Sequence, residues 1–567
     1  MSLLVALGCA GCWPFDPSLV PRDGAMPLDA RDDGQAPADA RLDAPDATSP
    51  RTCVSGGGGA VVFSSRALAS AGRTIGDVAM IDSGRADGSH DLVIVDRVEP
   101  FGALAAGALS RTLPGARCSE EDAPIEAPWS GVVATSGTDQ LVASVLPLAR
   151  SGTALDYVLS RSGGAGVVLW RAAAGYVDRD LARDPLPGTD VAVGDLNEDG
   201  RLDLVSFGGA LGSPLRVVLG QPSGWLDSTP IEDAIGVGRA WLLDVDRDGH
   251  LDLVTAPETD PTVFPQSGWE GHTPALSALY LGDGTGALVR SAASNLSNML
   301  APHGSAVLAD LDDDGWLDIF QIACGWDPGD ATRLPATVSV ASCDAVRLMN
   351  DGTGRFVPFT QRVSEIGVRR VGSRAPAVAS DLDLDGHIDV VLALDQLMVL
   401  HSEPVTLEDW RFVQASEGAL GLDSLELGEE PRVVVGDLDA EGADDVVVVD
   451  RQPGGLARLM MSHADSHRVS VRLRGRAGNP DAIGAELCLY RTEDLPAGPE
   501  CTGPMVTHRH RFATTTQPQA PLILFGLVTD VAYTLRVRWP HVEGSSDEPT
   551  DIAVSSAGPR VVEVTAP

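Results

Sequence analysis

Residues 310–318 read DLDDDGWLD, and the same nine-residue pattern occurs four more times in this chain of 567 residues. The other copies are DLNEDGRLD (195–203), DVDRDGHLD (244–252), DLDLDGHID (381–389) and DLDAEGADD (437–445). We number the copies loops 1 to 5 in chain order. Each has acidic residues or asparagine at positions 1, 3, 5 and 9, glycine at position 6, and apolar residues behind it. The pattern predicts five tight turns, each between two β-strands.

The residue types in these loops are those that bind calcium. Ca²⁺ takes six to eight oxygen ligands at about 2.3–2.6 Å, which side chains at positions 1, 3, 5 and 9 and the backbone carbonyl at position 7 would supply. Glycine at position 6 permits the positive φ of a sharp turn. We therefore expect about five structural Ca²⁺ ions, one in each loop. The expected ligands, with position 7 acting through its backbone oxygen, are Asp195, Asn197, Asp199, Arg201, Asp203, Asp244, Asp246, Asp248, His250, Asp252, Asp310, Asp312, Asp314, Trp316, Asp318, Asp381, Asp383, Asp385, His387, Asp389, Asp437, Asp439, Glu441, Ala443 and Asp445.

Two alternatives fit the loops less well. An EF-hand needs a bidentate Glu at position 12 and a helix on each side. Position 12 is not acidic in any loop, being Ser206, Thr255, Gln321, Leu392 and Val448. Asp-Gly turns without metal would leave several carboxylates in mutual repulsion. At position 7, where the backbone oxygen is the expected ligand, we expect the side chains of His250 and His387 to point to solvent.

The loops resemble those of the FG-GAP and VCBS repeat families, which form β-propellers such as the head of the integrin α-chain. Two further segments, LYLGDGTGAL (279–288) and RLMNDGTGRF (347–356), resemble the turns found between blades of the VCBS type. The resemblance implies a propeller whose calcium loops each join two strands of one blade.

The spacing of the repeats indicates how many blades there are. Successive ninth positions (203, 252, 318, 389 and 445) are 49, 66, 71 and 56 residues apart, enough for four strands each. ADGSHDLVIVD (86–96) is a worn copy of the pattern, and SGTALDYVLS (151–160) resembles a blade without acidic ligands. We therefore expect a seven-bladed β-propeller over residues 53–466, whose closure leaves no free sheet edge. A solenoid is the weaker alternative, because each unit carries several short strands.

The amino terminus, MSLLVALGCAGC (1–12), resembles a bacterial lipoprotein signal segment, with Cys9 or Cys12 as the candidate lipidated residue. It lacks a basic n-region, and its apolar run is short for a signal peptide. Residues 13–52 are rich in Asp, Ala and Pro and predict a disordered linker. We expect an exported protein, either a cell-envelope lipoprotein (periplasmic or outer-surface) or a secreted one, that meets a membrane only through its anchor.

Six further cysteines are compatible with disulfide bonds in an oxidising compartment. Neighbours in sequence suggest the pairs Cys53–Cys118, Cys324–Cys343 and Cys488–Cys501, although six cysteines allow 15 pairings. Scattered buried thiols are the alternative.

Residues 467–567 follow a different pattern that begins HRVSVRLRGRAGNPDAIGAELCLYR. They resemble the ASPIC/UnbV domain, which follows VCBS-type repeats in bacterial proteins and in the cartilage acidic protein family. The matching segments are 472–475, Asn479, 481–485, 525–527 and 537–540. The resemblance implies no defined activity, and the strand alternation predicts a small β-sandwich. The histidines of His508-Arg509-His510-Arg511 are either a metal pair or, as we expect, part of a solvated face.

The fold class expected is therefore all-β: a seven-bladed propeller with calcium-binding hairpin loops, followed by the small β-sandwich. A formal net charge of −39 excludes nucleic acid as a partner. All basic residues are Arg, and no HExxH, GxSxG or Walker motif occurs. We therefore expect no catalytic residues. The predicted function is a monomeric adhesion or interaction module that binds a protein or glycan on the cell envelope.

A propeller that binds or cleaves polysaccharide, in the manner of a lyase, is the alternative function. It would need a base and a cation in the central cleft. Tryptophans would form its sugar platform, unless they pack between the blades; they are Trp129, Trp170, Trp225, Trp241, Trp269, Trp316 and Trp326.

Overall fold

The structure is a computed structural model of the chain. It describes residues 62–67, 74–82, 86, 88, 90–97, 105–109, 130–134, 142–149, 155–161, 167–171, 176–178, 190–208, 214–221, 224–225, 229–257, 277–296, 306–324, 343–362, 377–393, 397–406, 409–414, 427, 431–438, 443–450, 457–463, 468–514, 517–544, 548–558 and 560–567. All of these belong to one compact unit, Pro50–Pro567. The predicted signal segment, the linker, Cys53 and Cys118 lie outside the described residues.

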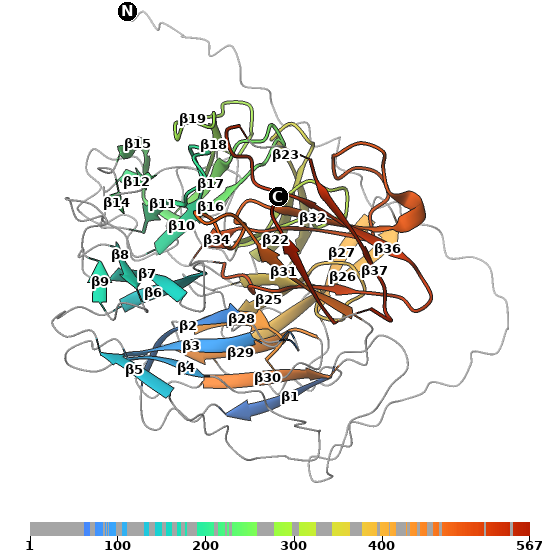
Figure 1. The fold of residues 1–567 in the computed structure, drawn as a ribbon, viewed down its shortest axis with the longest axis horizontal. Coiled ribbons are helices and arrows are strands. Elements are labelled where there is room, and N and C mark those ends of the chain that lie inside the picture. Colours follow the sequence, from blue (N-terminus) through green and yellow to red (C-terminus); the bar gives the residue numbers. More distant parts are fainter. Residues whose placement is uncertain are drawn as a thin grey trace, which may run out of the picture. The chain divides into compact units, whose positions relative to one another are not determined.

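The described residues are almost entirely β-structure, as expected, with one short 3₁₀ helix, η5 (Thr492–Asp494). Up to residue 463 the strands form a series of antiparallel sheets with one repeated order (Figure 1). Six of these sheets have four strands each. They comprise β2 (Thr74–Asp82), β3 (His90–Arg97), β4 (Ala105–Leu109), β5 (Ser130–Ala134); β6 (Val142–Ala149), β7 (Leu155–Arg161), β8 (Val167–Arg171), β9 (Tyr176–Asp178); β16 (Val237–Leu243), β17 (Asp252–Pro257), β18 (Ala278–Gly282), β19 (Leu288–Arg290); β20 (Ala306–Ala309), β21 (Asp318–Cys324), β22 (Cys343–Asn350), β23 (Phe356–Arg362); β24 (Ala377–Ser380), β25 (Asp389–Ala393), β26 (Leu397–Thr406), β27 (Asp409–Gln414); and β28 (Pro431–Gly436), β29 (Asp445–Asp450), β30 (Ala457–His463), β1 (Val62–Ala67).

One further sheet takes its fifth strand from the C-terminal part of the chain. Its order is β15 (Thr229–Ile235), β12 (Pro214–Val218), β11 (Asp203–Phe207), β10 (Asp190–Gly194) and β34 (Ala513–Thr514). The small hairpin β13 (Gly220–Gln221) and β14 (Gly224–Trp225) lies between β12 and β15 in sequence. Strand β34 therefore connects residues 53–466 with residues 467–567, which the sequence pattern predicts to be separate domains.

The first strands of successive sheets lie beside one another. Strand β2 is next to β6, β6 to β10, and β10 to β16, while β20 is next to β24 and β24 to β28. The side chain of Arg239 in β16 donates to the backbone oxygen of Ala306 in β20 (3.2 Å), and β28 lies beside β2. This arrangement of radiating sheets is propeller-like.

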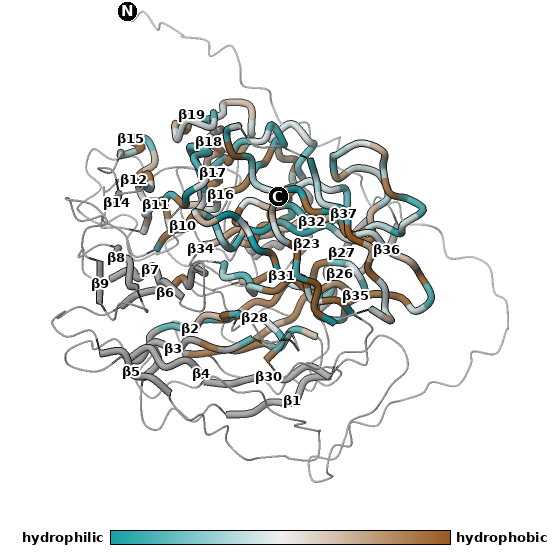
Figure 2. The backbone as a smooth tube through the Cα atoms, in the orientation of Figure 1, coloured by the Kyte–Doolittle hydropathy of each residue, from teal (hydrophilic) through white to brown (hydrophobic). Residues whose placement is uncertain are grey.

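Apolar side chains fill the space between neighbouring sheets. The second strands read as nearly continuous apolar runs such as DLVSF in β11, which is buried at every position because sheets cover both of its faces. One cluster joins Val205 and Phe207 to Leu242 and Leu253 of the next sheet. Figure 2 shows the contrast between hydrophobic strands and the more hydrophilic loops that connect them.

The C-terminal residues form two sheets with a common core. One sheet has the order β35 (Ile523–Gly526), β31 (Arg468–Arg474), β38 (Val561–Thr565), with β31 and β38 parallel. The other has the order β33 (Thr507–His510), β32 (Glu486–Arg491), β36 (Tyr533–Arg538), β37 (Thr550–Val554). Apolar residues from both sheets, including Val471 and Leu487, form one cluster. No helix in the described part of the chain is long and apolar enough to cross a membrane.

Two sequence predictions concern the cysteines. Cys488 and Cys501 form the predicted disulfide, with their Cα atoms 5.9 Å apart. Cys324 and Cys343 lie directly opposite each other in the register of β21 and β22. A Cys324–Cys343 bond stays a prediction that this register favours.

The Gly-rich turns lie elsewhere than predicted. Segments 283–286 and 351–354 connect the third and fourth strands of one sheet (β18 to β19 and β22 to β23), and not neighbouring blades. Each reaches sideways instead: Gly286 donates its N–H to the Leu196 oxygen in loop 1 (2.9 Å). Gly286 has φ 86°, which costs a residue without a Cβ little. The turns therefore brace the loop of the preceding sheet.

Candidate metal loops and their interface

All five loops join the first and second strands of a sheet, as predicted. Loop 3, for example, runs from β20 to β21, whose register pairs Ala309 with Asp318. The glycine at position 6 has a positive φ wherever it is described: 80° at Gly200, 92° at Gly315 and 104° at Gly386. The sequence therefore predicted both the place of the turns and the reason for their glycine.

The position-9 aspartate is the internal support of each loop. Asp318 is fully buried, and its Oδ2 accepts the N–H of Leu311 (3.0 Å) while Oδ1 accepts the N–H of Asn350 at the end of the third strand (2.8 Å). Loops 1, 2 and 4 repeat both hydrogen bonds through Asp203, Asp252 and Asp389. This carboxylate therefore ties the loop to two strands as well as facing the other acidic side chains.

The position-1 aspartate presents an oxygen that lacks a hydrogen-bond donor. In loop 3 the N–H of Gly315 donates to Asp310 Oδ2 (2.9 Å), but Asp310 Oδ1 is buried without a hydrogen-bond partner among the described residues. The same holds for Oδ1 of Asp244 in loop 2 and of Asp381 in loop 4. A buried carboxylate oxygen without a donor is costly, and a bound cation removes that cost.

The other loop carboxylates lie close to these oxygens. In loop 3, ligand oxygens of Asp310, Asp312 and Asp318 lie within 4.8 Å of one another. In loops 2 and 4 the same is true of positions 1, 3 and 5, that is Asp244, Asp246 and Asp248, and Asp381, Asp383 and Asp385. An all-carboxylate oxygen set of this kind fits Ca²⁺.

Burial works against ionisation of these groups when no metal is present. It raises the pKa of Asp195 to about 6, of Asp203 and Asp244 to about 7, and of Asp252 to about 8. Neighbouring loop carboxylates add to each of these increases. A divalent cation would have the opposite effect, because it favours the charged form.

The predicted ligand residues of loops 1 to 4 are all described, and in loops 2 to 4 the structure brings ligand oxygens of three of them within 4.8 Å of one another. In loop 5, Asp437, Ala443 and Asp445 are described, whereas Asp439 and Glu441 lie outside the described residues. Loop 1 differs from loops 2 to 4, because both oxygens of Asp195 accept backbone N–H groups, from Asp199 (3.2 Å) and Gly200 (2.8 Å).

The prediction for the histidines at position 7 was wrong. His250 Nδ1 contacts Glu198 Oε1 at position 4 of loop 1, and His387 Nδ1 lies 2.6 Å from Asp313 Oδ2 at position 4 of loop 3. Both histidines therefore contact the preceding loop, while their side chains stay 32% and 25% exposed.

A third contact of the same kind links loops 2 and 3. The Arg247 guanidinium at position 4 of loop 2 lies 4.3 Å from the ring centre of Trp316 at position 7 of loop 3. The residues at position 4 adopt the left-handed region although none is glycine, with φ of 56° at Glu198, 58° at Arg247 and 57° at Asp313. Complementary residue types at positions 4 and 7 of successive loops were the sequence signal for this contact.

The C-terminal strands place cations on the position-1 aspartates. His508 Nδ1 lies 3.1 Å from Asp310 Oδ2, and Arg509 Nη2 donates to Asp381 Oδ2 (3.2 Å). In loop 5, Arg468 Nη1 is 3.0 Å from Asp437 Oδ2. The prediction of a solvated face around His508 was therefore wrong: its side chain is fully buried between the two regions.

Glu486 in β32 binds several cationic side chains of this interface. It accepts hydrogen bonds from Arg247 Nη2 (2.7 Å), His508 Nε2 (2.7 Å) and Arg538 Nη1. Burial alone would raise the pKa of Glu486, but the hydrogen bond from His508 and the surrounding positive charges hold it well below its usual range. Burial alone would lower the pKa of His508, but its two carboxylate partners raise it.

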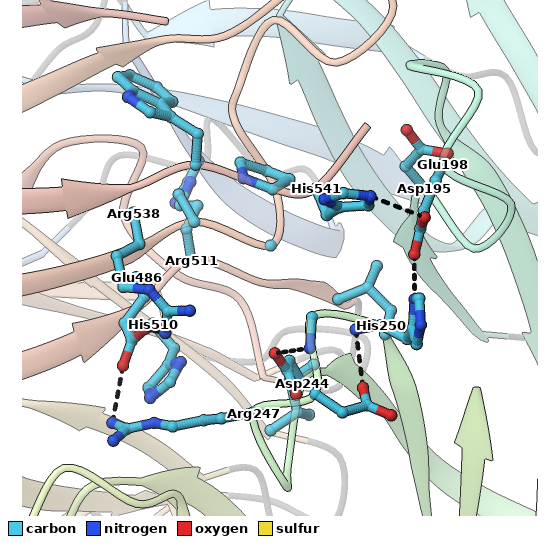
Figure 3. A pocket seen from close by; sticks show the side chains of 18 of the residues that line it. Asp195, Glu198, Asp244, Arg247, His250, Glu486, His510, Arg511, Arg538 and His541 are labelled. Atoms are coloured by element: carbon cyan, nitrogen blue, oxygen red, sulfur yellow. Dashed lines mark hydrogen bonds and ion pairs between the residues drawn. The ribbon is translucent and has the colours of Figure 1, made fainter. Parts of the chain in front are cut away.

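Beside Glu486 lies a cavity of about 320 Å³ between loops 1 and 2 and the C-terminal sheets (Figure 3). Glu198 spans its far side, between His250 and His541. Sequence reasoning missed Glu486, Glu198 and His541, because each is singled out only by its partners.

Segment 513–522 reaches the first strands of the sheets. Strand β34 pairs with β10, and Gln517 Oε1 accepts both the indole N–H of Trp241 in β16 (2.8 Å) and the N–H of Leu308 in β20 (2.9 Å). Trp241 is fully buried among apolar residues. This tryptophan therefore packs in the core and offers no sugar platform.

Residues 244–320, which hold loops 2 and 3, match the FG-GAP-like repeat family. This stretch is similar to an FG-GAP-like repeat. In both of its loops the position-1 aspartate has an oxygen without a donor, and β17 to β20 lie within the matched residues. No curated protein matches the chain in sequence.

Several solved structures resemble the chain at low identity. The periplasmic gluconolactonase PpgL of Pseudomonas aeruginosa is 13% identical over 69% of this chain and 95% of that one, with a TM-score of 0.29. Sqt1 of Saccharomyces cerevisiae is 9% identical over 83% and 99%, with a TM-score of 0.34. The exotype rhamnogalacturonan lyase YesX is 12% identical over 56% and 58%, with a TM-score of 0.23. With TM-scores under 0.5, none of these likenesses bears on the activity of this chain.

Proposed function

We propose that the chain is an exported, calcium-clamped interaction module in which a closed seven-bladed β-propeller presents its metal loops to its own C-terminal domain. About five Ca²⁺ ions, one per loop, would hold the blades and the interface together. The observation that carries the proposal is the buried Oδ1 atom without a hydrogen-bond donor on Asp244, Asp310 and Asp381.

The strand pairing supports closure and the count of seven. Strand β1, from the N-terminal side, completes the sheet that β28, β29 and β30 begin some 370 residues later. The first strand of that sheet, β28, lies beside β2 of the first sheet. Closing a ring by mixing the two ends of the chain in one sheet removes the free edges.

The loop chemistry supports calcium as the ion. Carboxylates at positions 1, 3, 5 and 9 are hard oxygen ligands, and the turn glycine leaves room for the position-7 carbonyl to join them. Calcium would neutralise groups that burial and mutual repulsion disfavour as anions.

The interface supports a role in binding rather than catalysis. The C-terminal domain, which we infer to be of the ASPIC/UnbV type, covers loops 3 and 4 through His508 and Arg509. Segment 513–522 contacts three first strands, where a lyase would need its catalytic groups. The remaining surfaces would bind a protein or glycan of the cell envelope, with the protein acting as a monomer held by a lipid anchor or secreted.

The test is thermal unfolding of the full chain with calcium and after chelation with EGTA, together with metal content by mass spectrometry. We expect about five calcium ions per chain and a large fall in the midpoint after chelation. The exposed Asp283, which lies in a turn outside the loops, gives the control variant Asp283→Asn, which should behave like wild type. An unchanged midpoint and no bound calcium would refute the proposal.

A further inference from the structure

Loop 4 differs from loops 1 to 3 in carrying a histidine of its own sheet, His401, in one group with two of its carboxylates, Asp383 and Asp389. His401 in β26 directly precedes Ser402, whose N–H donates to the position-9 Asp389 (3.0 Å). The equivalent donors in loops 1, 2 and 3 are Gly220, Gly282 and Asn350. The residues that precede those donors, and so occupy the place of His401, are apolar: Leu219, Leu281 and Met349.

The imidazole of His401 spans the acidic side chains. Its Nδ1 lies 2.8 Å from Asp389 Oδ1, and its Nε2 lies 3.4 Å from Asp383 Oδ2. Ligand atoms of Asp383, Asp389 and His401 lie within 4.8 Å of one another. Asp383 also belongs to the group formed with Asp381 and Asp385, so the two groups meet at this residue.

A second observation points to a cation at this place. Asp381 is 4% exposed, and its Oδ1 has no hydrogen-bond partner among the described residues, while its Oδ2 is held by Gly386 and Arg509. The unmatched oxygen belongs to Asp381, which is grouped with Asp383, one of the two carboxylates that His401 contacts.

Ligand chemistry then separates loop 4 from the rest. Ca²⁺ and Mg²⁺ take oxygen ligands, whereas imidazole nitrogen suits borderline transition metals such as Zn²⁺. A site with one imidazole and several carboxylates favours Zn²⁺ over Ca²⁺ relative to an all-oxygen site. The groups of close ligand atoms in loops 2 and 3 hold carboxylates alone, and His508, which contacts Asp310 of loop 3, stands outside its group.

We propose that loop 4 is a transition-metal site of the zinc type, built from Asp381, Asp383, Asp389 and His401, in a chain whose other loops take calcium. The inference rests on the proposed function, because it assumes that the loops bind divalent cations. It assigns a different ion to the fourth loop. Zinc would then act on the blade of loop 4, and on Arg509 that contacts Asp381, separately from calcium.

The first experiment is dialysis of the full chain against Ca²⁺ and Zn²⁺ together, followed by metal content by mass spectrometry. We expect one zinc and about four calcium ions per chain. About five calcium ions and no zinc would overturn this inference and leave the proposed function standing. No bound metal of either kind would overturn both.

Variants then locate the zinc. His401→Leu restores the residue type of loops 1 and 2 and should weaken zinc binding by at least about 10–100-fold, the loss seen when even an outer-shell partner of a ligand is removed. His541→Leu removes a histidine that lies outside the five loops and should leave zinc binding unchanged. Unchanged zinc affinity in His401→Leu would overturn the assignment.

Met349→His gives a gain-of-function test that does not depend on a loss of stability. It places an imidazole against Asp310, Asp312 and Asp318 of loop 3, so a second zinc should bind. With Co²⁺ as a spectroscopic probe, nitrogen ligation should change the visible absorption of the wild type and of Met349→His, but not of His401→Leu. A spectrum insensitive to residue 401 would show that His401 only donates a hydrogen bond, and would overturn the proposal.

Discussion

Loops 1 and 3 share the same nine-residue spacing but place their first aspartate in different surroundings. In loop 1 both oxygens of Asp195 accept backbone N–H groups. In loop 3 one oxygen of Asp310 accepts Gly315 N–H and contacts His508, and the other has no hydrogen-bond donor among the described residues. The comparison teaches that one motif supports two roles: a turn that satisfies itself, and a turn completed by an ion and a neighbouring domain.

The two loops also differ in charge, and this difference too makes a cation more important for loop 3. Loop 1 has three carboxylates at its ligand positions, and Arg201 lies 3.1 Å from one of them, Asp199. Loop 3 has four carboxylates at those positions, and each loop has one more at position 4, Glu198 in loop 1 and Asp313 in loop 3. Without metal, loop 3 carries more repulsion and more unsatisfied polar surface, so calcium should matter more there.

The most severe test of this contrast is the pair Asp310→Asn and Asp195→Asn. In calcium, Asp310→Asn should lower the free energy of unfolding by at least about 3 kcal/mol, the stabilisation expected of an ion present near 100 times its Kd. Asp195→Asn should cost clearly less, because the asparagine oxygen still accepts a backbone N–H. Urea unfolding at fixed calcium measures both values, and equal losses would end the distinction between the two loops.

The domain interface gives the next largest effect. Glu486→Gln removes the charge shared by Arg247, His508 and Arg538, and should cost about 1.5–3 kcal/mol, the worth of a hydrogen bond to a charged group. Glu500, whose side chain is half-exposed beside Arg538, gives the control Glu500→Gln, with a cost near zero.

Calcium titration of the same variants sharpens the comparison. Because His508 links Glu486 to Asp310, Glu486→Gln should weaken calcium binding at loop 3 and leave loop 1 unaffected. Equal calcium affinities in wild type and Glu486→Gln would mean that the interface and the loops act independently.

Much of the fold follows from local sequence. The apolar runs behind each loop predict buried strands, and the loop spacing predicts where each sheet begins. Even the imperfect copy at 86–96 falls on a hairpin, because it covers most of β3, which pairs with β2. There Arg472 makes two hydrogen bonds to Asp82, of 2.5 and 2.9 Å, so that a C-terminal cation faces this turn as well. The sheet at β6 to β9, with no acidic loop, is predictable only by spacing.

The candidate site was predictable only in part. Ligand positions follow from residue type and spacing within nine residues. The environment of those ligands depends on contacts between distant segments: His508 reaches Asp310 across 198 positions, and His387 reaches Asp313 across 74. A histidine on a strand looks the same in sequence whether solvent or a buried carboxylate faces it, so the solvated interpretation failed.

Acidity should separate the metal-free protein from the calcium-bound one. Burial raises the pKa of Asp312 and Asp383 to about 7, from an ordinary value of 3.8. Carboxyls with a raised folded-state pKa stabilise the fold fully below the unfolded value and lose that contribution as pH rises through the folded value. The EGTA-treated protein should therefore unfold at a higher temperature at pH 6 than at pH 8.

The stabilisation that calcium provides should depend on pH in the opposite way. Protons compete with the ion for the loop carboxylates, so the increase in midpoint that calcium produces should be smaller at pH 6 than at pH 8. Differential scanning calorimetry at the two pH values, with and without calcium, gives all four midpoints. A metal-free midpoint that is lower at pH 6 than at pH 8 would contradict the raised pKa values of these carboxyls.

The smallest expected effect concerns the contacts between successive loops. His387→Gln breaks the pair with Asp313, whose side chain is 14% exposed, and should cost about 1 kcal/mol. His250→Gln breaks the matching pair with Glu198, which also contacts His541 and so keeps a partner. The His250 variant should therefore lose less stability than the His387 variant.

If successive loops are coupled through positions 4 and 7, His387→Gln should also weaken calcium binding in loop 3, while Asp283→Asn should not. Loss of stability without any change in calcium affinity would show that these contacts brace the blades but do not connect the metal sites.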